Sequence, residues 1–261
     1  MPESRNVRGW SDDEFLTWYG ALEKRHLANL TFQEVRRAVQ ALSSAYVERR
    51  KAGGIDNALK GAGKRAAFAL FYAPLHFLIV REAVRTTGAA DSGLKNLVDL
   101  GCGTGASGAA WALEMPSPPR VTGIERNSWA AAEARWTYRT LGLEATLRNV
   151  DIARFSLPGP GAGILSAFTA NELDEDSRSN LLAALLNAAD RGAAVLVVEP
   201  IARKLTPWWD HWTNAFEARR GVGMDCRFEA WLPDSLRLMD RAAGLNHNIL
   251  TGRVLWLPGQ L

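Results

Sequence analysis

Short apolar runs alternate with longer amphipathic segments from residue 96 onward. The apolar runs occupy residues 96–100, 120–124, 145–149, 164–168 and 193–198, and the amphipathic segments occupy residues 106–115, 128–141 and 175–190. Short runs without regular polar alternation are typical of parallel strands that are buried on both faces. The pattern therefore predicts an α/β fold built on a doubly wound, Rossmann-like sheet.

The first 95 residues have a helical pattern instead. Ser11 to Glu14 has the spacing of a capping box ahead of a helix at residues 12–25. A second helix is predicted at residues 31–50, and an apolar helix that ends near residue 87 follows a basic stretch. We therefore expect a helical N-terminal extension at residues 1–95 and the sheet domain at residues 96–261.

The pattern changes again after the fifth apolar run. Residues 201–231 are predicted to form an insertion or lid, and residues 233–243 a helix. Residues 246–250 and 253–257 flank Thr251-Gly252, which is typical of an antiparallel hairpin. With this terminal hairpin, the predicted sheet has seven strands.

Composition narrows the class of protein. The chain has 261 residues, of which 47% are hydrophobic and 23% are charged, and a net charge of +3. These values predict one large or two small globular domains and exclude a disordered or fibrous chain. Cys102 and Cys226 form no C-x-x-C pair, so we expect no metal site and a reducing compartment. The charged N-terminus and an apolar stretch of only 15 residues (66–80) predict a cytoplasmic protein without a membrane span.

A glycine-rich loop follows the first predicted strand. Gly101-Cys-Gly103-Thr-Gly105 leads directly into a predicted helix, whose free N–H groups favour a negatively charged ligand group. Gly103, Gly105 and Gly108 also satisfy the dinucleotide pattern, so a nicotinamide or flavin enzyme stays possible from the loop alone. Asp99 argues against a pyrophosphate, which it would repel, and for a ligand with ammonium and sulfonium groups.

The arrangement from Asp99 to Gly105 resembles the first motif of class I S-adenosylmethionine-dependent methyltransferases. Glu125 ends the second strand, where a carboxylate can accept hydrogen bonds from both ribose hydroxyls. The resemblance implies that Asp151 faces the adenine amino group and that Asn171 lines the methyl-transfer pocket. The cofactor is then S-adenosylmethionine, and its candidate contacts are Asp99, Gly101, Cys102, Gly103, Gly105, Glu125, Arg126, Asp151, Ile152 and Asn171.

A catalytic base depends on the acceptor atom. An amine or ring nitrogen can lose its proton after methyl transfer, whereas a hydroxyl acceptor would be helped by a base. The candidate catalytic residues are Asn171, Glu172, Glu199 and His211. Glu172 could instead belong to a helix-capping cluster with Asp174 and Asp176.

A narrower resemblance spans residues 40–200. Leu42-Ser-Ser-Ala-Tyr46, Ala73-Pro74, Arg81, Asn171-Glu172-Leu173 and Val197-Val-Glu199-Pro200 are similar to the ribosomal small-subunit-associated methyltransferase-like family. The chain lacks the cysteine cluster of that family, and Ile201-Ala-Arg replaces its Gly-Thr-Pro. The resemblance implies ribosomal RNA or the small ribosomal subunit as partner.

Charge distribution adds a second pointer to RNA. Residues 1–95 carry 15 basic and 10 acidic side chains, a balance of +5, whereas residues 96–261 carry 16 and 18, a balance of −2. Between residues 49 and 65, only Asp56 opposes six cations: Arg49, Arg50, Lys51, Lys60, Lys64 and Arg65. This stretch could contact phosphates or could be a solvated surface.

Three of the ten tryptophans gather in the insertion. Trp208 and Trp212 share one helical face, and Trp209 points elsewhere. They could stack on a planar methyl acceptor or pack a helix against the sheet. With Arg81 they are the candidate substrate contacts. Three functions follow: an RNA methyltransferase, a small-molecule methyltransferase, or a non-catalytic S-adenosylmethionine-binding factor in ribosome assembly.

Overall fold

The computed structural model describes residues 12–48 and 59–259. The predicted capping box begins at Ser11 and therefore lies partly outside the described residues. The helices are α1 (Asp12–His26), α2 (Phe32–Glu48), α3 (Ala62–Ala67), η3 (Phe68–Tyr72), α4 (Ala73–Thr87), η4 (Ala89–Asp91), α5 (Ala106–Glu114), α6 (Ser128–Thr140), η5 (Ile152–Arg154), η6 (Ala170–Glu172), α7 (Glu175–Asp190), η7 (Arg203–Leu205), α8 (Trp209–Glu217) and α9 (Asp234–Ala242).

One sheet of seven strands forms the centre of the molecule. Its strands are β1 (Asn96–Leu100), β2 (Arg120–Ile124), β3 (Ala145–Arg148), β4 (Ala162–Ala167), β5 (Ala194–Glu199), β6 (Val222–Glu229) and β7 (Ile249–Leu257). They are ordered β3-β2-β1-β4-β5-β7-β6, and only the pairs β5–β7 and β6–β7 are antiparallel. The predicted doubly wound sheet with an antiparallel end is confirmed.

The sheet ends in an antiparallel pair as predicted, but the prediction of its turn at Thr251-Gly252 is wrong. Thr251 and Gly252 lie within the continuous strand β7, which pairs along its length with β6. Gly252 has a packing role there, because a Cβ atom would come within 2.8 Å of Ile79 Cγ2 in α4. The predicted insertion at residues 201–231 therefore contains η7, α8 and β6, and helix α9 connects the two antiparallel strands.

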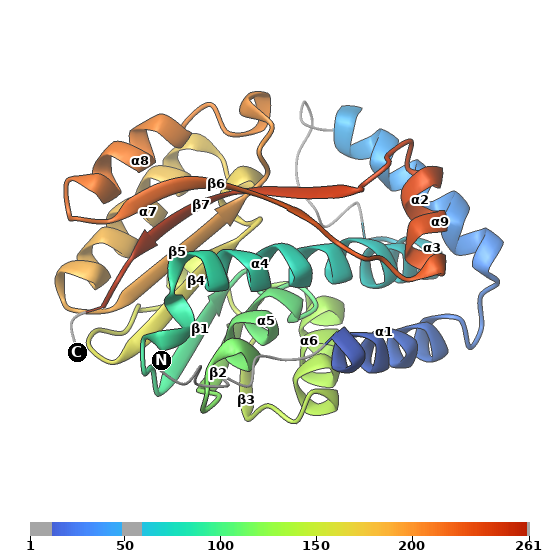
Figure 1. Ribbon diagram of the computed structural model, residues 1–261, viewed down its shortest axis with the longest axis horizontal. Helices are drawn as coiled ribbons and strands as arrows, with labels where there is room; N and C mark the ends of the chain where they lie inside the picture. Colours follow the sequence, from blue (N-terminus) through green and yellow to red (C-terminus); the bar gives the residue numbers. More distant parts are fainter. Residues whose placement is uncertain (1–11, 49–58, 260–261) are drawn as a thin grey trace, which may run out of the picture.

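Helices cover both faces of the sheet (Figure 1). Helices α4 and α5 contribute to the hydrophobic core on one face, and α7 and α8 to the core on the other. Strands β6 and β7 run on beyond the parallel strands toward α2, α3 and α9. This places helical segments beside the carboxyl ends of the parallel strands, where ligands bind in such sheets.

The N-terminal helices share the core of the sheet domain. Phe15 and Trp18 of α1 pack on Phe77 of α4, with ring centroids 5.6 and 5.2 Å apart. Arg25 donates hydrogen bonds of 2.9 and 2.8 Å to Glu133 of α6. Burial raises the pKa of Glu133, but hydrogen bonds from His26 and Arg25 more than offset this effect and lower it to about 2. The domain boundary at residue 95 stays a prediction, and helices on its two sides pack against one another.

Residues 62–87 form one long helical rod, α3–η3–α4, with a π-helical stretch at Phe68–Tyr72. Its 26 residues exceed the 15-residue apolar stretch seen in the sequence, and its length and composition would suffice to cross a membrane. In this structure, however, 83% of its most apolar window is buried inside the protein. The rod is a core element that packs on α5, β6 and β7.

Candidate functional site

The glycine loop makes a tight turn between β1 and α5. Gly101, Gly103 and Gly105 have positive φ angles of 63°, 52° and 81°, which side chains with a Cβ atom rarely adopt. The Gly105 N–H group donates a 2.7 Å hydrogen bond to the Cys102 carbonyl. Cys102 is buried, which raises the pKa of its thiol well above the usual value. The loop therefore presents backbone atoms, and its cysteine is not an activated nucleophile.

Asp99 lies beneath this loop. Asp99 is only 1% exposed. Its Oδ2 atom accepts hydrogen bonds from the Gly108 N–H group (2.9 Å) and the Tyr138 hydroxyl (3.1 Å). Burial raises the pKa of Asp99 to about 7, although these hydrogen bonds act in the opposite direction. The carboxyl group thus holds the start of α5 in place. Its predicted contact with a ligand ammonium group stays a prediction.

Glu125 joins the loop to the end of β2. Its Oε2 atom accepts a 3.0 Å hydrogen bond from the Gly103 N–H group, and its Oε1 atom accepts a 2.7 Å hydrogen bond from the Asn127 N–H group. The side-chain amide of Asn149 donates to the carbonyls of Glu125 (2.7 Å) and Arg126 (2.9 Å). Asn149 carries no motif signal in the sequence, yet it ties the end of β3 to the end of β2.

Asp151 and Ile152 lie next to this pair, after β3. The Asp151 carboxylate accepts a 2.9 Å hydrogen bond from the Ala153 N–H group and lies 3.9 Å from the Arg126 guanidinium. Both Asp151 and Ile152 are half-buried, and Arg126 is exposed. The structure therefore brings the residues predicted for the ribose and adenine together at the carboxyl ends of β2 and β3.

The segment after β4 rests on a buried carboxyl group. Glu199 is 0% exposed, and its Oε1 atom accepts a 2.8 Å hydrogen bond from the Ala170 N–H group. Burial raises the pKa of Glu199 to about 8, so the group is mainly protonated at neutral pH. Its Oε2 atom and the Oδ1 atom of Asn171 are buried without a hydrogen-bond partner. Glu199 therefore lies beneath this segment, and Asn171 lies within it.

Glu172 lies close enough to Glu199 for its charge to help raise the pKa of that carboxyl group, after the larger effect of burial. Glu172 is exposed just before α7, and His211 is exposed on α8. Helix α7 is capped by Asp174, which accepts a 2.7 Å hydrogen bond from the Ser177 N–H group. Arg81 packs over Phe15 and donates a 3.1 Å hydrogen bond to Asp12, so it contributes to the contact between α4 and α1.

The three clustered tryptophans pack α8 onto the sheet. Trp209 and Trp212 are 4% and 1% exposed and belong to the core under α7 and α8. Trp208 packs on Trp212 with ring centroids 4.6 Å apart, as their shared helical face predicts. Arg178 of α7 lies 5.4 Å above the Trp208 ring. Packing of α8 on the sheet, one of the two expected roles of these tryptophans, accounts for these contacts. The other role, stacking on a methyl acceptor, stays a prediction.

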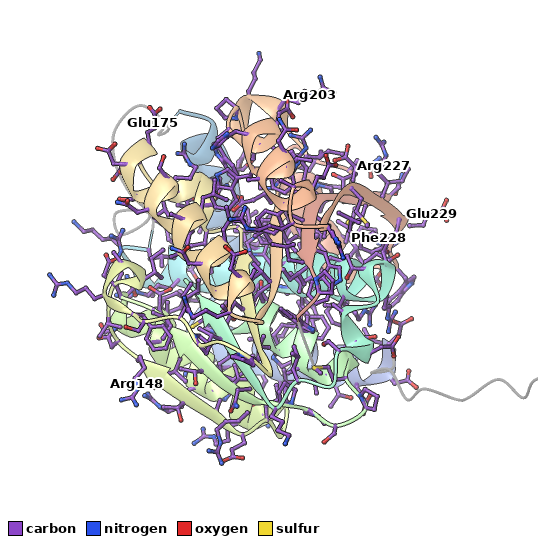
Figure 2. The ribbon with its side chains drawn as sticks, turned by 90° about the vertical axis from the view of Figure 1, so that its left-hand side faces the viewer. Arg148, Glu175, Arg203, Arg227, Phe228 and Glu229 are labelled. Atoms are coloured by element: carbon purple, nitrogen blue, oxygen red, sulfur yellow. The ribbon has the colours of Figure 1, made fainter. Side chains whose placement is uncertain are left out.

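Charged side chains border the same edge of the sheet. Arg148 ends β3, Glu175 begins α7 and Arg203 begins η7, and all three are exposed. Figure 2 shows their side chains at the periphery, pointing outward from the ribbon. Their charged groups therefore face solvent.

The basic stretch is described only in part, because Arg49, Arg50, Lys51 and Asp56 lie outside the described residues. Lys60 is exposed and Lys64 is half-buried. Arg65 donates a 3.0 Å hydrogen bond to the Leu59 carbonyl and lies 5.5 Å above the Trp129 ring. Within residues 12–48 and 59–259, no group of three or more His, Cys, Asp or Glu side chains could hold a metal ion.

Four clustered rings, of which Phe68 borders the glycine loop, carry no motif signal. Phe68, Tyr72 and His76 lie on the long helical rod, and Phe168 follows β4. The sequence offers one usable sign, the spacing of four residues between the first three rings, which places them near one another on a helix.

Comparisons with known proteins return matches of fold only. No protein-family model and no curated protein sequence matches the chain. The solved structure of mitomycin 7-O-methyltransferase MmcR is similar at 17% identity and a TM-score of 0.49, covering 90% of this chain and 71% of its own. Magnesium protoporphyrin IX methyltransferase from Synechocystis PCC 6803, solved with S-adenosylmethionine, is 14% identical with a TM-score of 0.46, covering 85% of this chain and 95% of its own.

A ribosomal RNA methylase from Streptococcus thermophilus is also similar, at 14% identity and a TM-score of 0.43 over 69% of this chain and 94% of its own. These three proteins differ in what their names say they methylate. The strand order, the antiparallel last strand and the glycine loop after β1 give this chain the fold of the class I S-adenosylmethionine-dependent methyltransferases.

Proposed function

We propose that this protein is a methyltransferase that binds S-adenosylmethionine at the carboxyl ends of β1, β2 and β3. The observation that carries the proposal is the Glu125 carboxylate, which is hydrogen-bonded to the Gly103 N–H group at 3.0 Å. This contact places a ribose-binding type of side chain directly against a backbone loop that could cradle a ligand.

The residues at this edge fit the proposed cofactor. A Cβ atom on Gly101 would come within 2.7 Å of Thr169, and one on Gly103 would fill space next to the Phe68 ring. We assign the methionine part of the cofactor to Gly101–Gly105, the ribose hydroxyls to Glu125, and the adenine to Asp151 and Ile152. We assign Asn171 to the methyl-transfer pocket, as the resemblance of the sequence implies.

When bound, the cofactor supplies a methyl group that its sulfonium already activates. The chain has to align the acceptor with that methyl group, and positioning alone contributes about 7–11 kcal/mol in well-oriented systems. A methyltransferase therefore does not require a base, so the proposed activity does not depend on Glu172, Glu199 or His211 acting as one.

Calorimetry with S-adenosylhomocysteine tests the proposal. We expect binding by the wild-type protein and an affinity at least 10-fold lower for Glu125→Ala, because a lost hydrogen bond to a charged group costs about 1.5–3 kcal/mol. Glu144→Ala is the matched control, since Glu144 is an exposed residue that pairs with Arg120 before β3. Binding of a nicotinamide dinucleotide without binding of S-adenosylhomocysteine would overturn the proposal.

Ribosomal RNA is a second proposal, for the acceptor. It is supported by the balance of +5 in residues 1–95 and by the resemblance over residues 40–200. If most of the six cations between residues 49 and 65 contact phosphates, the affinity for single-stranded RNA should fall with a log–log salt slope of about −4. A flat salt response would favour a small acceptor, and binding without methyl transfer would favour a non-catalytic assembly factor. A cytoplasmic location is proposed with either acceptor.

A further inference from the structure

One face of the long helical rod is partly open. Between residues 66 and 84 every residue is buried except Tyr72, His76 and Glu82. The rings of Tyr72 and His76 lie 6.3 Å apart, centroid to centroid. Two polar aromatic rings thus keep exposed surface in an otherwise buried core helix, at a place where apolar packing alone would favour buried aliphatic side chains.

A third ring links this face to the glycine loop. The Phe68 ring lies 5.9 Å from Tyr72 and meets His76 edge-on, at 6.5 Å and 86°. A Cβ atom on Gly103 would be 3.8 Å from the Phe68 ring, so the ring borders the loop. Phe68 and Tyr72 begin and end the π-helical stretch, and such π-helical turns occur frequently at functional sites.

The fourth ring belongs to Phe168, which directly follows β4 and faces His76 of the helical rod. Phe168 stacks on His76 with centroids 3.8 Å apart and ring planes 11° apart. Its backbone has a φ angle of 56°, which is strained for a bulky residue. The Phe168 N–H group donates a 2.8 Å hydrogen bond to the Val198 carbonyl, which holds this conformation. Backbone strain of this kind clusters at ligand-binding sites. Here the strained conformation of Phe168 directs its ring toward His76 on the helical rod.

The four rings are uncharged near neutral pH. Burial lowers the pKa of His76 to about 3 and raises the pKa of Tyr72 to about 12. A neutral imidazole has one ring nitrogen that accepts a hydrogen bond, and a tyrosine hydroxyl donates one. The cluster therefore combines flat apolar surfaces with polar atoms that can accept or donate a hydrogen bond, among them the accepting ring nitrogen of His76.

We propose that Phe68, Tyr72, His76 and Phe168 form the wall of the methyl-acceptor site and bind a planar aromatic acceptor whose hydroxyl or ring N–H group donates a hydrogen bond to His76. The inference rests on the proposed function, because Phe68 borders the loop to which the cofactor is assigned. It moves the acceptor away from Trp208, Trp209 and Trp212, which pack in the core on the other face of the sheet.

The test compares two alcohols of similar size on the full chain saturated with S-adenosylhomocysteine. 2-Naphthol is planar and aromatic, whereas decahydro-2-naphthol is saturated and puckered. We expect saturation-transfer NMR titrations to show at least 10-fold tighter binding of 2-naphthol. Equal affinities for the two alcohols, or binding of neither up to their solubility limits, would overturn the proposal.

Variants locate the binding. Phe168→Leu and His76→Leu should each weaken 2-naphthol binding at least fivefold while affinity for S-adenosylhomocysteine stays within twofold. Phe216→Leu is the matched control, because Phe216 is buried in the core on the other face and its ring should not touch the acceptor. Should Phe168→Leu fail to fold, His76→Leu decides. If neither variant weakens 2-naphthol binding, the assigned wall is wrong.

Two further arms separate the possible origins of the result. Displacement of 2-naphthol by a single-stranded RNA oligomer would mean that the planar ring is a nucleobase of RNA, and no displacement would mean a small aromatic molecule; both support the wall. If wild-type protein binds S-adenosylhomocysteine but does not prefer 2-naphthol, the wall fails and the proposed function stands. If it prefers 2-naphthol but does not bind S-adenosylhomocysteine, the proposed function fails.

Discussion

The carboxyl edge of the sheet has two halves that are built differently. At β1–β3, half-buried carboxylates such as Glu125 and Asp151 accept hydrogen bonds from neighbouring backbone N–H groups. At β4 and β5, the carboxyl group of Glu199 is fully buried with one unpartnered oxygen, and the strained Phe168 stacks on His76. The first half is polar and made of local segments, whereas the second is aromatic and needs a helix that is distant in sequence.

This difference fits the two tasks that we propose. A cofactor with a charged, invariant structure suits a backbone loop and fixed carboxylates. The proposed planar acceptor suits aromatic side chains from a helix outside the loop, because flat rings stack on one another. Five predictions can break or sharpen this comparison.

The largest effect is expected in the cofactor half, at Gly108. A Cβ atom there would come within 2.9 Å of the Tyr138 hydroxyl and closer still to the Asp99 carboxylate, both of which are buried. Gly108→Ala should lower the free energy of unfolding by about 3 kcal/mol, measured by denaturant titration. Gly20→Ala is the control, because nothing lies within 4 Å of its Cβ position in α1, and it should stabilise by up to about 1 kcal/mol. Equal effects of the two would show that the first turn of α5 is not tightly packed on Asp99 and Tyr138.

In the other half, Glu199 should matter for stability. Glu199→Leu leaves the Ala170 N–H group without its acceptor and should cost about 2 kcal/mol, whereas Glu199→Gln keeps an acceptor oxygen and should cost less. The measurement is again denaturant unfolding at pH 6.5. A milder loss for Leu than for Gln would contradict the role of this hydrogen bond.

The same residue predicts a pH dependence. The pKa of Glu199 is about 8 in the folded protein and lower when unfolded, so the native state holds a proton that the unfolded state has released. The contribution of the Glu199 carboxyl group to the free energy of unfolding is therefore present at low pH and is lost as the pH rises through about 8. Between pH 6.5 and 8 the wild-type protein should lose more stability than Glu199→Gln. Parallel pH profiles for the two proteins would show that this carboxyl is ionised throughout.

A smaller effect is expected at Asn149, which links the ends of β2 and β3. Asn149→Ala removes hydrogen bonds to the Glu125 and Arg126 carbonyls. We expect affinity for S-adenosylhomocysteine to fall about 5-fold in calorimetry, because net hydrogen bonds contribute about 1 kcal/mol each. Asn180→Ala, at an exposed position of α7, is the control and should change nothing. An unchanged affinity for Asn149→Ala would mean that this linkage does not position the cofactor half.

The smallest effect is expected at Trp208. Its indole N–H group is buried without a partner, so Trp208→Phe removes no hydrogen bond and keeps an aromatic ring against Trp212. Affinities for S-adenosylhomocysteine and 2-naphthol should stay within twofold of wild type in calorimetry and NMR titration. A loss of more than fivefold in 2-naphthol binding would return the acceptor to α8 and its tryptophans.

Much of the fold was predictable because its signals are local. Strands β1 and β2 and helix α7 lie where the apolar periodicity places them. The error at Thr251-Gly252 arose because glycine marks both turns and sites of close packing, and only the approach of Ile79 distinguishes them.

The sequence by itself determined the parallel sheet, the glycine loop and the carboxylates after β2 and β3, because strand burial and loop conformation depend on neighbouring residues. Only the tertiary structure decided that Asp99 and Glu199 lie beneath the site and that Phe168 meets His76, 92 positions apart in the numbering. The physical reason is that burial and ring stacking are set by which elements pack together. Periodicity reveals that a helix has an apolar face but not what that face contacts.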